Sequence, residues 1–114
     1  MYYVYIVRCA GDTFYTGMAH DLCQRLREHV TCAPTCAKYT RSHKVVALAM
    51  AWQVQDRSAA LRLEHAIKKL TRAQKIALID APTTASALCE GVETTPLSDI
   101  TLQDCLNGKA EVAQ

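Results

Sequence analysis

The apolar positions at the start of the chain follow the pattern of a β-hairpin. Residues 2–9 are rich in β-branched and aromatic side chains and predict a strand. A turn follows, and residues 13–16 predict a short partner strand that Gly17 closes. A second apolar run, residues 44–54, is also partly β-branched, so we expect a third strand there.

Between and after these strands, apolar residues recur at helical spacing and predict three helices. Asp21 is a suitable N-cap for a helix over about residues 22–30, and Asp56 caps the second helix. Thr71 and Gln74 form a capping-box pattern that starts a third helix, which runs to about Ile79. The buried stripes of the first two helices are Leu22, Leu26 and Val30, and Ala60, Leu63, Ile67 and Leu70.

The predicted order of elements is β-β-α-β-α-α, which places the chain in the α/β (α+β) class. We expect a small three-stranded, mainly antiparallel sheet flanked by helices within residues 1–80. Residues 31–43 lack apolar periodicity and predict a loop. Residues 81–114 are expected to form an acidic tail that is partly helical or disordered. Four apolar residues could form a short helix on that tail: Leu97, Ile100, Leu102 and Leu106.

Composition agrees with a small folded protein and argues against several other classes. Half of the 114 residues are apolar and 21% are charged, which is typical of a globular domain. The longest apolar runs are far shorter than the roughly 20 residues that span a bilayer. The N-terminus lacks the basic region of a signal peptide, so we expect a cytoplasmic protein with reduced thiols.

Two of the six cysteines leave a metal site open as an alternative. Cys32 and Cys36 lie near His29 and His43 in the sequence. Their C-x3-C spacing fits a structural zinc site only loosely, and no second Cys/His pair follows at a usual distance. A cysteine on a predicted helix, such as Cys23, can also act as a small hydrophobic residue.

The formal net charge of +2 conceals an uneven distribution along the chain. Residues 1–79 carry twelve Lys and Arg against five Asp and Glu, which is +7. Residues 80–114 carry only Lys109 against six acidic residues, which is −5. A basic body indicates a polyanionic partner such as nucleic acid, although many small domains of this charge are simply soluble.

Three polar residues lie beside the predicted apolar stripes and therefore need a chemical or structural reason. Arg25 and His29 are four residues apart, so they lie one above the other at the edge of the first helix's apolar stripe. Glu64 lies at the edge of the apolar face of the second helix. The structural alternatives are a satisfied core histidine at His29 and a surface ion pair between Glu64 and Lys68.

Two tripeptides of the predicted hairpin, residues 3–5 (Tyr-Val-Tyr) and residues 15–17 (Tyr-Thr-Gly), precede these polar residues. Arg25 follows Tyr15 by ten residues, His29 follows Arg25 by four, and Glu64 is the acid on a later helix. This ordered set resembles the GIY-YIG nuclease superfamily.

The resemblance covers roughly residues 1–79. Residues 37–41 and 66–71 are similar to stretches in the compact single-domain bacterial branch of that family. The first tripeptide lacks the family's glycine, which the compact branch tolerates. The loop after the first helix carries Cys32, Pro34 and Cys36 where that branch is rich in glycine and lysine, so substrate contacts through this loop are in doubt.

The resemblance implies a metal-dependent DNA endonuclease that hydrolyses phosphodiester bonds. In the roles that it implies, Glu64 holds Mg²⁺ or Mn²⁺ and Arg25 binds the phosphate through its planar guanidinium. Tyr15 activates the attacking water, Tyr5 orients that water, and His29 relays a proton. A free tyrosine has a pKa of about 10, so either tyrosine needs a nearby cation to act as a base. The residues leave open which tyrosine does so.

The charge and the resemblance together imply DNA as the partner, single-stranded or branched, in a structure-specific or repair setting. No membrane is expected, and no protein partner is indicated. The alternative is a non-catalytic nucleic-acid-binding module that keeps the fold, and the basic residues could also form a solvated face. The acidic tail could lie over this basic face and compete with DNA. The candidate DNA-binding residues are Lys38, Tyr39, Arg41, Lys68, Lys69 and Arg72.

Overall fold

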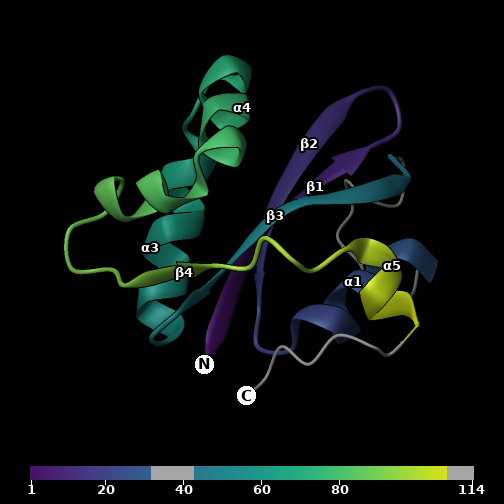
Figure 1. The fold of residues 1–114 in the computed structure, drawn as a ribbon, viewed down its shortest axis with the longest axis horizontal. Helices are drawn as coiled ribbons and strands as arrows, with labels where there is room; N and C mark the ends of the chain where they lie inside the picture. The colour runs from purple at the N-terminus through teal and green to yellow at the C-terminus, as the bar shows by residue number, and fades with distance from the viewer. Residues whose placement is uncertain (32–42, 108–114) are drawn as a thin grey trace.

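The chain folds around a four-stranded antiparallel sheet. Its structure, a computed structural model, describes residues 1–31 and 43–107. The strands are β1 (Tyr2–Cys9), β2 (Thr13–Ala19), β3 (Val45–Val54) and β4 (Thr94–Pro96). Their order in the sheet is β2-β1-β3-β4, so β2 and β4 form the two edges (Figure 1).

Helices cover both faces of the sheet. The helices are α1 (Leu22–Thr31), α3 (Arg57–Lys68), α4 (Arg72–Asp80) and α5 (Leu102–Leu106), with the 3-10 helix η1 (Pro82–Ala87) after α4. α3 and α4 lie on one side of the sheet, and α1 and α5 lie on the other, so the fold has three layers (Figure 1). This arrangement confirms the predicted fold class.

Three helices begin at the residues that the sequence predicts. Asp21 accepts a hydrogen bond from the backbone amide three residues further on, at 3.1 Å. Asp56 does the same for α3, at 2.8 Å. Thr71 and Gln74 form the predicted capping box of α4. Each cap satisfies amides that the first helical turn leaves without partners, which is why the polar residue at that position sets the start of the helix.

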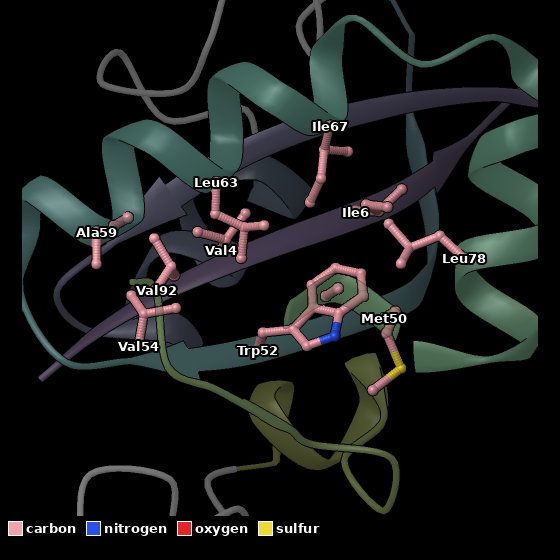
Figure 2. Packing of buried hydrophobic residues seen from close by; sticks show 12 residues of the cluster. Val4, Ile6, Met50, Trp52, Val54, Ala59, Leu63, Ile67, Leu78 and Val92 are labelled. Carbon is pink, nitrogen blue, oxygen red and sulfur yellow. The ribbon is translucent and has the colours of Figure 1, made fainter. Parts of the chain in front are cut away.

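The alternation of β1 sends its side chains into two separate cores. On one side, Val4 and Ile6 pack against Trp52 of β3 and against Leu63 and Ile67 of α3, and all five are fully buried (Figure 2). We call this side the apolar face. Its buried members are Val4, Ile6, Met50, Trp52, Val54, Ala59, Ala60, Leu63, Ile67, Leu78, Ala85 and Val92.

On the other side of the sheet, the alternate residues of β1 face α1 and α5. Tyr3 and Tyr5 are both almost completely buried there, against Leu22 and Leu26 of α1. We call this side the tyrosine face. Its buried members are Tyr3, Tyr5, Val7, Cys9, Leu22, Cys23, Leu26, Val45, Ala51 and Cys105.

The C-terminal segment adds a strand that the sequence did not predict. β4 pairs with the end of β3, so the sheet has four strands and not three. This strand has only three residues and ends in a proline, so it lacks the length and alternation that mark a strand in a sequence. Ala85 and Val92 of the same segment are buried in the apolar face. The described part of the predicted tail therefore packs on the body, while the domain boundary at residue 80 stays a prediction.

A disulfide joins Cys23 of α1 to Cys105 of α5, which contradicts the expectation of reduced thiols at these positions. The two cysteines are 82 residues apart in the chain, and only the packing of α5 against α1 brings them together. The predicted short helix is present only in part: α5 contains Leu102 and Leu106, whereas Leu97 and Ile100 precede it and pack on the tyrosine face.

Two further details complete the fold. β2 runs to Ala19, so Gly17 lies inside the strand, opposite Tyr5, and does not end it as predicted. Among the helices of residues 1–31 and 43–107, none has both the length and the apolar character needed to cross a membrane.

Candidate active site

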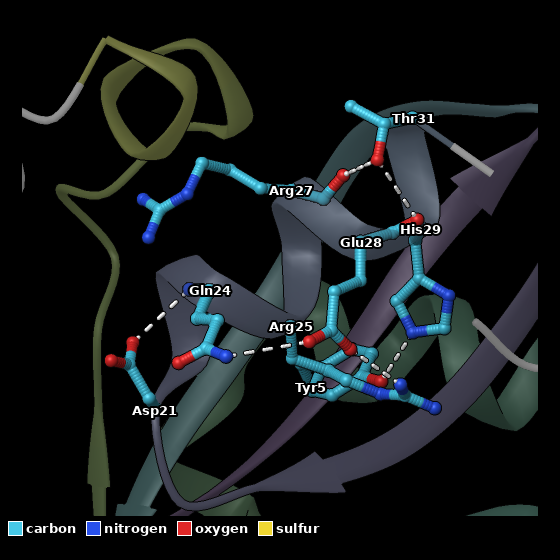
Figure 3. A network of polar contacts seen from close by, with 8 residues as sticks. All are labelled: Tyr5, Asp21, Gln24, Arg25, Arg27, Glu28, His29 and Thr31. Carbon is cyan, nitrogen blue, oxygen red and sulfur yellow. Dashed lines mark hydrogen bonds and ion pairs between the residues drawn. The ribbon is translucent and has the colours of Figure 1, made fainter. Parts of the chain in front are cut away.

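The cap of α1 sets the positions of two polar side chains on that helix. Because Asp21 fixes the start of α1, Arg25 lies one turn into the helix and His29 lies one turn further, on the same side. His29 is only 1% exposed, whereas Arg25 is partly open to solvent. Figure 3 shows both side chains pointing toward Tyr5 of β1.

The Tyr5 hydroxyl lies between Arg25 and His29. Its oxygen is 2.7 Å from His29 Nε2 (Figure 3), and the neighbouring Arg25 guanidinium favours the ionised form of the hydroxyl. We assign the Nδ1–H tautomer to the neutral His29 ring, in which Nε2 accepts a hydrogen bond from the Tyr5 hydroxyl.

Burial keeps both members of this hydrogen bond neutral. Burial, together with the Arg25 charge, lowers the pKa of His29 to about 4, although Glu28 acts in the opposite direction. Burial also raises the pKa of Tyr5 well above its usual value, and nearby Tyr15 and Glu64 act in the same direction while Arg25 lowers it. A neutral histidine accepting from a neutral tyrosine therefore describes this pair near pH 7.

The position of Tyr5 depends on a residue without a side chain on the neighbouring strand. A Cβ added at Gly17 would lie 2.5 Å from the Tyr5 hydroxyl oxygen and 2.7 Å from its Cζ. Those distances are far below van der Waals contact, so any larger residue at this position would displace the Tyr5 ring. The glycine of the second tripeptide therefore makes room for the tyrosine of the first.

Tyr15 of β2 lies on the open side of this arrangement. Its ring centroid is 5.6 Å from that of His29, in an edge-to-face contact. Burial raises the pKa of Tyr15, the positive charge of Arg25 lowers it, and the negative charge of Glu64 raises it. Tyr15 is partly exposed, whereas Tyr5 is completely buried, so Tyr15 is the tyrosine that solvent can reach.

Glu64 approaches the tyrosines from α3. Its charge acts on both Tyr5 and Tyr15, and its side chain is 18% exposed. Its Oε2 atom is 3.6 Å from Lys68 Nζ, so the ion pair that the sequence offered as an alternative is present. The structure thus brings together all five residues predicted for the chemistry, and we call them the five-residue cluster: Tyr5, Tyr15, Arg25, His29 and Glu64.

The donor set fits a hard divalent cation held by a single carboxylate. Mg²⁺ prefers oxygen ligands and keeps several waters, so one partly exposed carboxylate such as Glu64 suits it. Among the residues that the structure describes, no group of three or more His, Cys, Asp and Glu side chains could form an all-protein metal cage. The cluster therefore fits a cation that takes most of its ligands from water and substrate.

Sequence reasoning missed one residue beside the cluster. Glu28 Oε1 accepts a hydrogen bond from Arg25 at 2.8 Å, and Glu28 Oε2 accepts from Gln24 (Figure 3). Glu28 holds one guanidinium nitrogen of Arg25, and Figure 3 shows the guanidinium beside the Tyr5 hydroxyl. The three-residue spacing between Arg25 and Glu28 was the available signal, because side chains at that spacing are neighbours on a helix.

Two cavities adjoin the cluster. One of about 260 Å³ lies beside Arg25 and Glu28 at the start of α1, and it gives an anionic group access to the guanidinium. Another of about 700 Å³ lies between α3 and the segment around Leu88 and Cys89, and it meets the cluster only at Glu64. The smaller cavity meets the cluster only at Arg25, and its lining also includes the carboxylates of Asp21 and Glu28.

The predicted DNA-binding residues fall into two groups. Lys38, Tyr39 and Arg41, with Cys32 and Cys36 of the alternative zinc site, lie outside the described residues. Lys68 and Lys69 lie at the end of α3, beside the cluster and exposed on its outer side. Arg72 donates to Asp12 in the hairpin turn and lies 4.9 Å from the centre of the Phe14 ring, so it also ties α4 to the β1–β2 turn.

Comparison with known proteins gives consistent matches. The chain matches the family model described as the GIY-YIG catalytic domain over residues 1–77. It is 39% identical over 98 residues to UPF0213 protein YhbQ of Salmonella typhimurium, covering 86% of this chain and 96% of that protein. It is 41% identical over 81 residues to UPF0213 protein FN1575 of Fusobacterium nucleatum, covering 71% and 79% of the two chains. No solved structure shows a significant match.

Proposed function

The chain belongs to the GIY-YIG catalytic domain family, and from that premise we propose that it is a metal-dependent endonuclease that hydrolyses phosphodiester bonds in DNA. The observation that carries the proposal is the convergence of Arg25, His29 and Glu64 on two tyrosine hydroxyls. Hydrolysis of a phosphodiester needs a water molecule activated as the nucleophile, a cationic group that binds the phosphate, and stabilisation of the charge on the leaving oxygen. Residues of these types meet at one place.

Arg25 supplies the cationic group for the scissile phosphate. It is partly exposed, it borders the cavity of about 260 Å³, and Glu28 holds one of its nitrogens. A guanidinium retains its charge at any physiological pH and can bind two phosphate oxygens at once. Its alignment before substrate arrives lowers the cost of stabilising charge in the transition state.

Glu64 would hold the divalent cation, Mg²⁺ or Mn²⁺. When bound, such a cation polarises the phosphate and stabilises the leaving oxygen. Glu64 itself contributes one carboxylate ligand and stays close enough to the tyrosines for its charge to act on both hydroxyls.

The two tyrosines divide the work according to their exposure. Tyr15 is accessible to solvent, and we assign it the activation of the attacking water for that reason. Burial raises its pKa, and the charge of Arg25 offsets only part of that rise, so this role needs a cation near the hydroxyl. Tyr5 is buried, and its hydroxyl is hydrogen-bonded to His29. In this proposal Tyr5 orients the attacking water. His29 is neutral near pH 7, and its hydrogen bond to the Tyr5 hydroxyl is the contact that the proposed relay role uses. Burial and the Arg25 charge oppose this role, because they lower the pKa of His29 to about 4.

The partner that we propose is DNA, single-stranded or branched, in a repair setting. Lys68 and Lys69 at the end of α3 place positive charge beside the cluster, and contacts of this kind neutralise phosphates without reading bases. A non-catalytic nucleic-acid-binding module is the second candidate, because the ion pair between Glu64 and Lys68 can exist for structural reasons alone.

A cleavage panel tests the proposal. Single-stranded, nicked, flapped and four-way-junction DNA would be incubated with the protein and with Mg²⁺ or Mn²⁺. Cleavage of at least one substrate is expected, and Glu64→Gln should lower its rate by at least a hundredfold while metal-free DNA affinity stays within about twofold. Glu93→Gln, which changes an exposed acid on the C-terminal segment, is the matched control. If none of the substrates is cut, the binding-module function takes its place.

A further inference from the structure

Lys68 lies closer to the proposed chemistry than a general DNA-binding lysine needs to be. Its Nζ atom is 3.6 Å from Glu64 Oε2, and it lies 5.9 Å from the centre of the Tyr15 ring. The lysine side chain is 49% exposed, whereas that of Glu64 is only 18% exposed. The ammonium therefore covers the carboxylate from the solvent side, which is the side from which a cation or a substrate arrives.

Helix geometry distinguishes Lys68 from the lysine next to it. Lys68 follows Glu64 by four residues and therefore lies on the same side of α3. Lys69 follows Glu64 by five residues, which turns its side chain roughly 140° around the helix axis. The two lysines carry the same charge and are both at the end of α3, but only Lys68 shares the ion pair with Glu64.

An ammonium beside a carboxylate and a divalent cation on that carboxylate compete for the same oxygens. The lysine already neutralises part of the negative charge, and its own charge repels a second cation a few ångströms away. A phosphodiester brought to the same place offers Lys68 another anion to pair with. When the lysine pairs with the phosphate, Glu64 regains the charge that a metal ion requires.

We propose that Lys68 is a positioning residue that couples DNA binding to metal binding at Glu64. In the free protein, Lys68 pairs with Glu64 and keeps its affinity for divalent cations low. On DNA, Lys68 turns to a backbone phosphate beside the scissile bond and leaves Glu64 to the cation. This inference rests on the proposed function, because it assigns the metal to Glu64.

The coupling is reciprocal by thermodynamic necessity, so DNA tightens metal binding and metal tightens DNA binding by the same factor. The side chain of Lys68 has a flexible stem of four methylene carbons and is half exposed. Its ammonium can therefore move from Glu64 to a DNA phosphate without movement of the backbone. The consequence is that the cation is held firmly only when a substrate is present.

The test measures Mn²⁺ affinity by calorimetry on the full chain without DNA. We expect Lys68→Gln to bind Mn²⁺ about two- to fivefold more tightly than the wild type, as loss of a half-exposed ion pair predicts. Lys69→Gln removes the same charge from the next position and should change the affinity by less than twofold. Lys68→Arg, which restores a cation at the same place, should return the affinity to the wild-type value.

Two outcomes separate this inference from the function on which it rests. If Glu64→Gln weakens Mn²⁺ binding but Lys68→Gln and Lys69→Gln are indistinguishable, the coupling role of Lys68 is overturned and the metal role of Glu64 stands. If Glu64→Gln leaves the affinity unchanged, the proposed metal site fails and the inference fails with it. A second readout uses a single-stranded oligonucleotide with Ca²⁺, which should enhance DNA binding less in Lys68→Gln than in Lys69→Gln.

Discussion

Val4 and Ile6 of β1 enter the apolar face, whereas Tyr3 and Tyr5, which alternate with them, enter the tyrosine face. All four side chains are buried to nearly the same extent. The apolar face is closed by α3 and α4 with carbon-rich side chains, and the Trp52 indole nitrogen in it donates to the Pro82 carbonyl at 2.8 Å. The tyrosine face includes a buried hydroxyl that contacts a buried histidine.

The comparison separates two uses of buried surface. Burial of apolar area contributes stability in proportion to the area removed from water and requires no directional partner. Burial of Tyr5 and His29 has a desolvation cost, which their mutual hydrogen bond offsets. A sheet that buries apolar side chains on one face can maintain a polar cluster on the other face. The stabilisation from apolar burial offsets the desolvation cost of the polar cluster.

The largest effect is expected from a change on the apolar face. Trp52→Ala should lower the free energy of unfolding by about 3–5 kcal/mol, because a completely buried indole and its hydrogen bond are lost. Urea denaturation would measure the change, and Leu61→Ala, on the exposed side of α3, should change it by less than about 0.5 kcal/mol. DNA cleavage per folded molecule should remain close to wild type. A loss of cleavage out of proportion to unfolding would show that the two faces are not independent.

The disulfide between Cys23 of α1 and Cys105 of α5 should make the next largest contribution to stability. Replacing both Cys23 and Cys105 with serine is expected to lower stability by about 2–4 kcal/mol, since the bridge closes a long loop in the unfolded chain. Thermal melting of the double variant, beside the wild type with and without a thiol reductant, would measure it. A control Cys89→Ser variant changes a free thiol and should melt near the wild-type temperature. If reductant leaves the melting temperature of the wild type unchanged, the bridge does not stabilise the fold.

Acid should destabilise the tyrosine face through His29. The pKa of His29 is about 4 in the folded protein and 6.5 as the ordinary value, so the unfolded chain binds the proton first as pH falls. The contribution of neutral His29 to the free energy of unfolding is fully present above pH 6.5. It declines as the pH falls toward 4, by up to about 3 kcal/mol. Unfolding free energies measured between pH 7 and pH 4 should show this loss in the wild type. The loss should be smaller in His29→Asn, and equal slopes in the two proteins would contradict the assignment.

Removal of the Tyr5 hydroxyl should have the smallest effect on stability. Tyr5→Phe removes the hydroxyl that donates to His29 Nε2 and is expected to lower the free energy of unfolding by about 1 kcal/mol. Cleavage should nevertheless fall by at least tenfold, because the contact between Arg25 and His29 is broken at the hydroxyl that joins them. Tyr3→Phe, on the same face and equally buried, is the matched control and should retain cleavage. Equal loss of cleavage in both variants would assign the effect to packing.

The sequence predicted the elements and site residues that depend on local signals. The caps at Asp21, Asp56 and Thr71 mark helix starts because the side chain and the amides it satisfies are three residues apart. Contacts without such a signal were missed. β4 is too short to show alternation, and Cys23 and Cys105 are separated by most of the chain. The role of Gly17 was misread as a strand end because its reason is the approach of Tyr5 from another strand.

By itself, the sequence determined the order of elements, the alternation that divides β1 between two cores, and the residue types available for the chemistry. Each of these follows from spacing along the chain, which fixes the direction of side chains on a strand or helix. Only the tertiary structure decided that Tyr5 is buried and Tyr15 accessible, and that the Tyr5 hydroxyl meets His29. Those relations depend on how β2, α1 and α3 meet at the edge of the sheet. The spacing of residues within one helix or strand does not show how distant segments pack against each other.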